Sequence, residues 1–301
     1  MKHSSQPTKP ARRRWVRRIL WTSFIVLVVV PFIGMHCVSV VFALHDRSMK
    51  PYASKVVTSS LGHTLRCYEL KQADAKWDIV FIHGTPATAA VFGEQFRRPF
   101  PGANLIAADR PGFGGSGPDR RHTSLDDQAN AIGALLPHEP SRRTILVGHS
   151  YGAPVALTAA LKFPDQIAGV VLIGGSIDPA QERPFPIQHA VDWPLVSWLV
   201  PRSLRQCNRE LLTLRDDLTH LQAQLPKLTV PVVMLHGGSD YQVPVSNVEY
   251  VRSQLTNAGK DALFAQLIFP EYNHFIPWEH PDAVEAAIRK VTDRLSPQSD
   301  H

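Results

Sequence analysis

The sequence has few cysteines and no composition typical of a disordered chain. Only three of its 301 residues are cysteine, which excludes a small fold held together by a disulfide framework. Cys67 and Cys207 could pair in an oxidising compartment, but two separate buried thiols is the simpler interpretation. The hydrophobic content of 44% is enough for a large buried core, so we expect a globular protein.

The chain also lacks an excess of charge over most of its length. Its formal net charge is +6, but seven of the 32 Lys and Arg lie within residues 1–18, where there is no Asp or Glu. The remaining chain therefore carries 25 Lys and Arg against 26 Asp and Glu. A nearly neutral body has no basic surface of the kind that binds phosphates, so we expect no nucleic-acid partner.

Charged residues are missing altogether from Ile19 to Leu44. An apolar run of this length is typical of a transmembrane helix, and the basic tail before it predicts a cytoplasmic N-terminus. We therefore expect a basic cytoplasmic tail (1–18), a membrane anchor (19–44) and an extracytoplasmic body (45–301), which would be periplasmic in a bacterium. The alternative is a cleaved signal peptide, because small residues at 41–43 suit a signal peptidase.

Short apolar runs recur through the body and predict buried strands. Most are continuous rather than alternating, as expected of a parallel sheet covered on both faces. Helical patterns over 124–136, 151–163 and 281–295 lie among them, which indicates a doubly wound α/β fold, and residues 50–70 predict an opening hairpin. The predicted strands are Trp77–Gly84, Ala103–Arg110, Thr144–Ser150, Gly169–Ser176, Val230–Gly238 and Ala262–Pro270.

One insertion, residues 177–229, interrupts this rhythm. It is too long for an ordinary crossover loop and contains helical patterns of its own, so we expect a small helical lid. Trp193 and Trp198 lie in its most apolar stretch. We expect both to contact substrate in an acyl-binding pocket, although simple packing on the body would explain the same composition.

The motif Gly148-His149-Ser150-Tyr151-Gly152 matches G-x-S-x-G at the end of a predicted strand and the start of a helix. In that setting a strained turn projects the serine hydroxyl above the sheet, and side chains in place of the glycines would collide with neighbouring elements. Ser150 is therefore the predicted nucleophile.

A serine nucleophile needs a base and an acid that orients the base. Asp240 and His274 follow later strands, so both lie at the edge of the sheet where Ser150 emerges. We expect His274 to be the base and Asp240 the acid. Asp178 follows an earlier strand end and is the alternative acid, but it opens the 177–229 insertion.

Backbone N–H groups should stabilise the oxyanion that forms when the serine attacks. Tyr151, directly after the nucleophile, is expected to provide one of them. Thr85 in His83-Gly84-Thr85-Pro86 is expected to provide the other, because Pro86 has no N–H. His83 is expected to hold this loop in shape.

The segments HGTPATAAVF, DRPGFGGSG, GHSYGA, GSDYQVP and NHF occur in this order from His83 to Phe275. In these motifs the chain resembles the α/β-hydrolase superfamily of serine enzymes. The resemblance implies that fold, with Ser150, Asp240 and His274 as the triad and Thr85 and Tyr151 as oxyanion donors. The HGTP loop also resembles that of epoxide hydrolases and haloalkane dehalogenases, but those enzymes use an aspartate nucleophile.

Neither the glycine-rich motif after residue 111 nor the spacing of the histidines and acids indicates a bound cofactor or metal. Gly112, Gly114 and Gly117 satisfy G-x-G-x-x-G, but prolines interrupt the turn and no acidic residue follows a further strand at the required distance. The histidines and acids form no spacing typical of a metal site, so we expect neither metal nor cofactor.

The expected function is hydrolysis of an ester or related acyl bond in a small, hydrophobic substrate. The alternatives are cleavage of a carbon–carbon or peptide bond by the same triad, and a non-catalytic binding protein on this fold.

Overall fold

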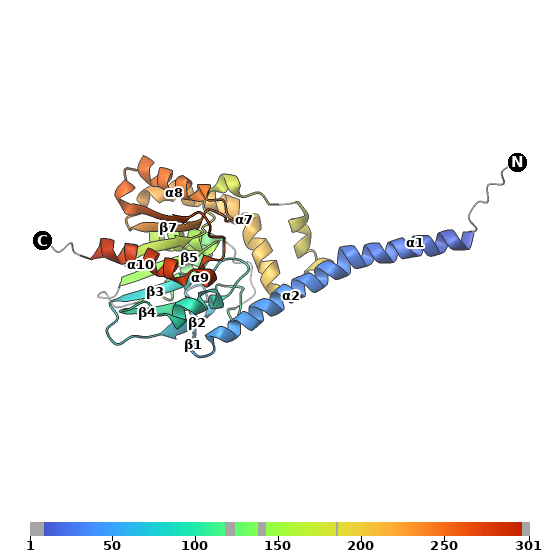
Figure 1. The fold of residues 1–301 in the computed structure, drawn as a ribbon, viewed down its shortest axis with the longest axis horizontal. Helices are drawn as coiled ribbons and strands as arrows, with labels where there is room; N and C mark the ends of the chain where they lie inside the picture. Colours follow the sequence, from blue (N-terminus) through green and yellow to red (C-terminus); the bar gives the residue numbers. More distant parts are fainter. Residues whose placement is uncertain (1–8, 118–123, 138–142, 185, 297–301) are drawn as a thin grey trace.

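A computed structural model describes residues 9–117, 124–137, 143–184 and 186–296. Its centre is an eight-stranded sheet in the order β1-β2-β4-β3-β5-β6-β7-β8 (Figure 1). β2 runs antiparallel to both β1 and β4, and every other neighbouring pair is parallel. This confirms the predicted opening hairpin and the mostly parallel, doubly wound sheet. The strands are β1 (Ala53–Thr58), β2 (Thr64–Leu70), β3 (Trp77–Ile82), β4 (Ala103–Ala108), β5 (Arg143–His149), β6 (Ile167–Ile173), β7 (Val232–Gly237) and β8 (Phe264–Phe269).

Helices cover both faces of the sheet, so the central strands are buried on both sides. In β5, Leu146 belongs to one buried cluster, whereas Ile145 and Val147 belong to the other. This alternation follows from the two-residue period of a strand. The helices of the body are α3 (Gly93–Arg97), α4 (Leu125–Gly133), α5 (Gly152–Lys162), α8 (Ser246–Asn257), α9 (Ile276–Glu279) and α10 (Pro281–Leu295), with a short 3-10 helix η3 (Ala89–Phe92).

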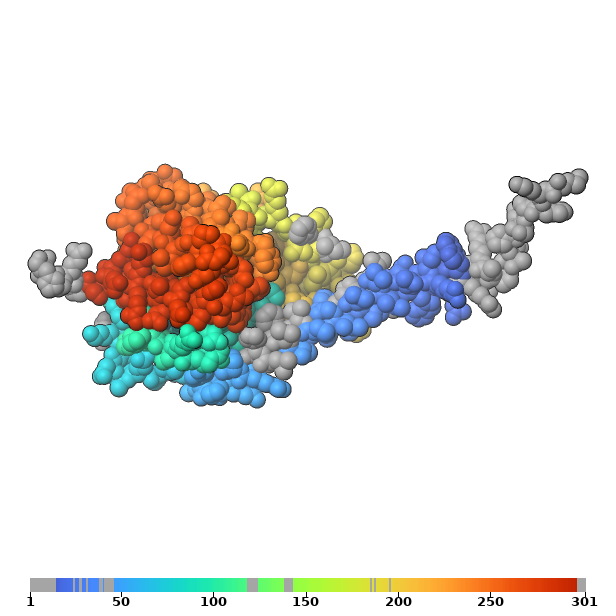
Figure 2. Space-filling model, viewed as in Figure 1, coloured from blue at the N-terminus to red at the C-terminus, as the bar shows by residue number. Residues whose placement is uncertain are grey.

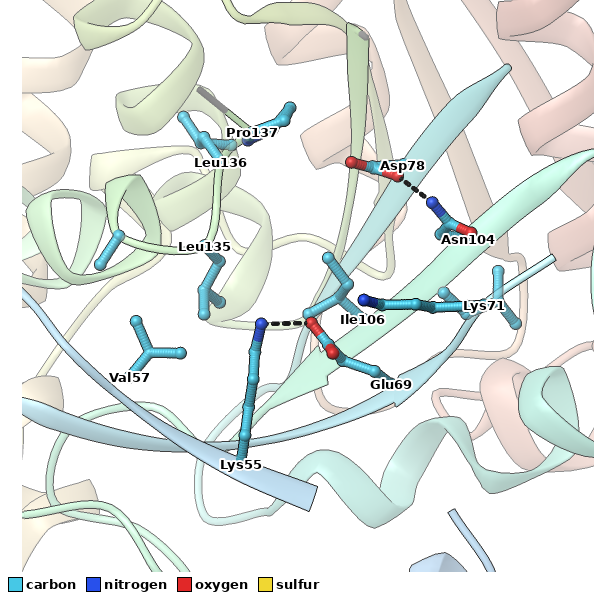
Figure 3. A pocket seen from close by; sticks show the side chains of 12 residues that line it. Lys55, Val57, Glu69, Lys71, Asp78, Asn104, Ile106, Leu135, Leu136 and Pro137 are labelled. Atoms are coloured by element: carbon cyan, nitrogen blue, oxygen red, sulfur yellow. Dashed lines mark hydrogen bonds and ion pairs between the residues drawn. The ribbon is translucent and has the colours of Figure 1, made fainter. Parts of the chain in front are cut away.

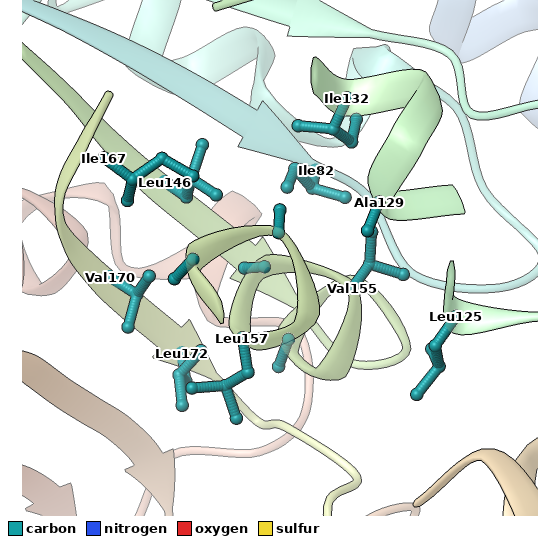
Figure 4. Close-up of a cluster of buried hydrophobic side chains, with 14 of the residues drawn as sticks. Ile82, Leu125, Ala129, Ile132, Leu146, Val155, Leu157, Ile167, Val170 and Leu172 are labelled. Atoms are coloured by element: carbon teal, nitrogen blue, oxygen red, sulfur yellow. The ribbon is translucent and has the colours of Figure 1, made fainter. Parts of the chain in front are cut away.

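The cluster on the α4 and α5 face is drawn in Figure 4. Val155 and Leu157 of α5 pack there with Leu146 of β5 and Leu172 of β6. All four side chains are fully buried, and burial of each such side chain stabilises the fold by roughly 1.5–3 kcal/mol. This packing fixes α5 directly behind the strand end that carries Ser150.

The N-terminal segment is helical but is not one continuous α-helix. α1 (Lys9–Phe24) and α2 (Val30–His45) have 16 residues each, and a π-helical segment η1 (Ile25–Val29) divides them. The segment extends away from the body in Figures 1 and 2. At its end, both carboxylate oxygens of Asp46 accept hydrogen bonds from Arg66 of β2 at 2.8 Å.

The structure does not support the prediction of a transmembrane helix over 19–44. Nowhere in the described ranges does a helix combine the length and the apolar character needed to cross a bilayer. The extracytoplasmic location of the body stays a prediction.

The insertion between β6 and β7 is helical, as its sequence predicts. Its longest element, α7 (Arg202–Gln224), packs Leu214, Leu218 and Leu221 into the α4 and α5 side of the core. The shorter elements are η4 (Pro179–Gln181), η5 (Pro186–Asp192), α6 (Pro194–Ser197) and η6 (Leu225–Lys227). Within the described residues all three cysteines are free thiols, so Cys67 and Cys207 do not pair.

Candidate active site

Ser150 lies in the sharp turn between β5 and α5. Its φ of 55° makes it the one non-glycine residue with positive φ in the described part of the chain. The Ser150 N–H donates to Ile173 O at 2.8 Å, and its carbonyl accepts from Ala153 N at 3.0 Å. Such a conformation is costly and persists only where the surroundings hold it, which is typical of a functional position.

The two glycines of the motif are required by close backbone approach. A Cβ on Gly148 would lie 2.3 Å from Gly152 O, and a Cβ on Gly152 would lie 2.1 Å from Ile82 O at the end of β3. Any side chain at either position would therefore push α5 away from the sheet. The spacing of the motif follows from this packing around Ser150.

The structure brings Asp240 and His274 together beside the same sheet edge. His274 Nδ1 donates to Asp240 Oδ2 at 2.6 Å, while Asp240 Oδ1 accepts from the backbone N–H groups of Gln242 and Val243, both at 2.9 Å. Burial of Asp240 opposes its ionisation, but the hydrogen bonds from His274 and the backbone outweigh burial and lower its pKa. Asp240 is thus an anion that holds His274 in the tautomer with a free Nε2 lone pair.

Asp178 does not take part in this arrangement. Its Oδ1 accepts from Ala180 N at 2.9 Å, where it caps η4. The tight turn after β7, rather than the start of the insertion, supplies the carboxylate next to His274.

His149 supports the backbone of His274, a role that the sequence did not suggest. His149 Nε2 lies 3.0 Å from His274 O, and because a carbonyl can only accept, Nε2 is the protonated nitrogen. Burial, followed by the proximity of His274, lowers the pKa of His149 to about 3. His149 is therefore a neutral, fixed donor.

The His83–Pro86 loop lies directly against Ser150. A Cβ on Gly84 would come within 2.7 Å of Ser150 Cβ, so only glycine allows this approach. His83 Nε2 accepts from Arg110 N at 2.9 Å, which leaves Nδ1 to donate to Gly84 O at 2.7 Å. His83 thus contacts the loop it was predicted to hold, and Thr85 lies at the nucleophile.

A cavity of about 580 Å³ opens above Ser150. Besides Ser150, His149 and His274, its wall contains Gly84 and Thr85. The rest of the lining is mainly apolar and comes from the loop after β3, from η3, from the loop after β7, and from α9 with the residue before it. These other lining residues are Pro86, Ala87, Thr88, Ala90, Val91, Gln242, Phe275, Trp278 and Glu279.

The structure does not bring Trp193 and Trp198 to this cavity. They are 63% and 72% exposed, and no described residue of the 177–229 insertion lines the wall. The aromatic side chains at the cavity are instead Phe275 and Trp278, directly after His274. Sequence composition missed them because their place depends on how α9 packs beside η3.

A second cavity, of about 390 Å³, is lined by residues of β1, β2, β3 and β4 and by residues 134–137 (Figure 3). Two pairs of its polar side chains bind each other: Lys55 Nζ lies 2.5 Å from Glu69 Oε1, and Asn104 Nδ2 donates to Asp78 Oδ1 at 2.7 Å. None of the predicted site residues lines it. The cavity above Ser150 is therefore the candidate active site.

Gly174, just after β6, provides a test of the Asp240–His274 geometry. Its φ is 51°, and a Cβ there would lie 3.2 Å from His274 Nδ1 and 3.3 Å from Asp240 Oδ2. We expect Gly174→Ala to displace the pair and to lower kcat for a short ester by up to about 10²-fold.

Gly259→Ala is the matched control for that variant. Gly259 has a similar φ of 69°, but nothing lies within 4 Å of the added Cβ. Both variants should lose stability in thermal unfolding, and only Gly174→Ala should lose turnover. Equal kcat values for two folded variants would contradict the proposed contact.

A family model described as the alpha/beta hydrolase fold matches residues 79–194. Among solved structures, an esterase from Exiguobacterium antarcticum has a TM-score of 0.60 and 19% sequence identity, covering 81% of this chain and 100% of that one. The chain has the α/β-hydrolase fold and resembles that superfamily over residues 79–194. Protein ABHD8 of Homo sapiens is 26% identical over 259 residues, which are 75% of this chain and 57% of that protein.

The chain spans a little over half the length of the ABHD8 proteins it matches. A second relative, the 2-(acetamidomethylene)succinate hydrolase of Mesorhizobium japonicum, is 36% identical over 95 residues, 32% of this chain and 34% of that protein. The relatives with a named activity are hydrolases, which supports an enzymatic role. Neither comparison reaches far enough to carry a substrate over to this chain.

Proposed function

We propose that this protein is a serine hydrolase that cleaves an ester or a related acyl bond through an acyl-enzyme on Ser150. The observation that carries the proposal is the 2.6 Å hydrogen bond between Asp240 and His274 at the cavity that holds Ser150. A buried carboxylate that orients an imidazole beside a strained serine is the arrangement that activates a hydroxyl.

The reaction would proceed in two halves. His274 Nε2 takes the proton of the Ser150 hydroxyl as its oxygen attacks the substrate carbonyl carbon, and the N–H groups of Thr85 and Tyr151 stabilise the resulting oxyanion. The imidazolium then gives this proton to the leaving alcohol, which departs and leaves an acyl-Ser150 ester. In the second half, water attacks that ester with His274 again as base, releasing the acid and restoring Ser150.

The cavity wall favours an apolar acyl group. Ala90 of η3 and Val91 are almost fully buried beside the cavity, and Phe275 and Trp278 line it as well. Apolar pockets with few polar groups suit hydrocarbon chains, whereas a charged acyl group would lose its hydration without a partner. We therefore favour esters of uncharged, hydrophobic acids.

Narrowing the cavity should change the preference for chain length. We expect Ala90→Leu to lower kcat/KM for an octanoyl ester at least about 10-fold relative to an acetyl ester, because the added carbons occupy acyl space. Trp193→Ala and Trp198→Ala are the controls, since both side chains are largely exposed and outside the cavity. A chain-length shift in the tryptophan variants but not in Ala90→Leu would move the acyl site to the insertion.

A fluorophosphonate probe tests the proposed class of enzyme. The folded protein should be labelled at Ser150, because the probe reacts with activated serines, and Ser150→Ala should not be labelled. A folded wild-type protein that fails to react would favour a non-catalytic binding role on the same fold.

A further inference from the structure

Arg110, just after β4, is fully buried and lies beneath the candidate oxyanion hole. All five of its guanidinium N–H groups have acceptors, which is the full donor capacity of an arginine. Nε donates to His83 O at 2.8 Å, and Nη2 donates to Gly84 O at 3.0 Å. The other acceptors are Gln128 Oε1 at 3.2 Å and the two carboxylate oxygens of Glu210 at 2.6 and 3.1 Å.

The same guanidinium contacts the residues of both proposed oxyanion donors. It holds the carbonyl of Gly84, which belongs to the same peptide unit as the Thr85 N–H. Its Cζ also lies 4.6 Å from the ring centroid of Tyr151. One buried cation therefore contacts both the peptide unit of the Thr85 N–H and the side chain of Tyr151.

The contact with Gly84 O determines where the Thr85 N–H points. A trans peptide is planar, so its C=O and N–H point in opposite directions. Gly84 O receives hydrogen bonds from both Arg110 Nη2 and His83 Nδ1, which holds it away from Ser150 and turns the Thr85 N–H toward the cavity. Among the described residues no backbone acceptor receives a hydrogen bond from the Thr85 N–H.

Glu210 connects this arrangement to the 177–229 insertion. It lies on α7, is fully buried, and is separated from Arg110 by 100 positions in the sequence. Burying such a pair costs desolvation that its attraction often fails to offset, so stability alone is a weak reason for it. If the pair instead holds the Gly84–Thr85 peptide in place, this role explains both the burial of the pair and the hydrogen bond from Arg110 to Gly84 O.

We propose that Arg110 and Glu210 are positioning residues that hold the Gly84–Thr85 peptide in the orientation of an oxyanion donor, and that they make this orientation depend on the seating of α7. The proposal rests on the serine hydrolase function argued above. It adds a dependence of the oxyanion hole on a helix that does not line the cavity.

The test is the double variant Arg110→Met/Glu210→Leu in the full chain. Apolar residues of similar size can replace a buried ion pair without leaving an unpaired charge. We expect kcat for p-nitrophenyl acetate to fall by about 10²-fold with KM changed less than about threefold, because one oxyanion donor is misdirected. The inhibition constant of an alkyl trifluoromethyl ketone, whose adduct carries an oxyanion, should rise by the same factor.

Arg202→Met is the matched control. Arg202 also lies on α7 and donates to a body carbonyl, Ser116 O, but it does not touch Gly84. It should leave kcat and inhibition by the ketone unchanged even where it lowers the melting temperature. A folded double variant that keeps the wild-type kcat and ketone affinity would overturn the proposal.

Two further measurements cover the remaining outcomes. If the double variant does not fold, Glu210→Gln is the substitute, because glutamine keeps the shape of the side chain and one acceptor. This variant should lower kcat about 3- to 10-fold, with a smaller loss of melting temperature than the double variant. An unchanged kcat would overturn the proposal.

If the wild type hydrolyses no ester, the proposed function fails, and a crystal structure of whichever variant folds decides the inference. A rotated Gly84–Thr85 peptide supports it, and an unmoved peptide overturns it.

Discussion

Replacing Ser150 with alanine should lower kcat for p-nitrophenyl acetate by about 10⁶-fold, because the reaction then has no nucleophile. Ser150 occupies the one strained non-glycine turn of the described chain, next to Gly84 and in the same cavity as His274. The measurement is the initial rate of p-nitrophenol release with wild type and variant at equal concentration.

The stability of Ser150→Ala, in contrast, should be close to that of the wild type. The strain at a φ of 55° remains in the variant, but the small, partly buried hydroxyl is lost with little packing, so the melting temperature should change by only a few degrees. Ser176→Ala is a suitable control, since Ser176 also follows a strand but binds Glu182 rather than the triad. Residual turnover above about 1% in pure Ser150→Ala would contradict the role of Ser150.

Asp240→Asn should lower kcat by about 10⁴-fold while the protein stays folded. An asparagine at 240 can present its amide N–H to His274 Nδ1, which favours the tautomer that has no lone pair on Nε2. The pKa of Asp240 is lowered in the folded protein, so the carboxylate contributes stability at neutral pH that the variant lacks. That contribution is lost in the wild type as the pH falls through the lowered pKa.

Asp178→Asn is the control, and we expect a change in kcat of less than about threefold. Asp178 caps η4 and binds no histidine in the described structure. Rates for both variants with a short ester, together with circular dichroism spectra, separate the two assignments. A large loss for Asp178→Asn with a small loss for Asp240→Asn would move the acid to position 178.

The fold was predictable because burial on both faces leaves a simple pattern in the sequence. Continuous apolar runs bounded by turn residues, such as residues 144–150, are typical of strands covered on both sides, and this one became β5, paired with its parallel neighbours. Ser150, Asp240 and His274 were predictable as a group because each follows the carboxyl end of a strand. Parallel strands bring such positions to one edge without any knowledge of side-chain contacts.

Other features depend on packing between distant segments and leave no local pattern. Trp193 and Trp198 have the composition expected of a pocket wall, yet both are exposed, while Phe275 and Trp278 reach the cavity. Glu210 lies among charges that are typical of a solvated helix face, and its partner is 100 positions away. Likewise, composition over 19–44 could not reveal that η1 divides the helix.

The central claim is that Ser150 carries the acyl group during turnover, and trapping that species tests it most directly. The protein is mixed with an excess of p-nitrophenyl octanoate, quenched with acid within milliseconds, digested and analysed by mass spectrometry. The account predicts an octanoyl group on the peptide that contains Ser150, formed together with a burst of p-nitrophenol. Turnover of the ester with no adduct on that peptide, or with the adduct on another residue, would contradict it.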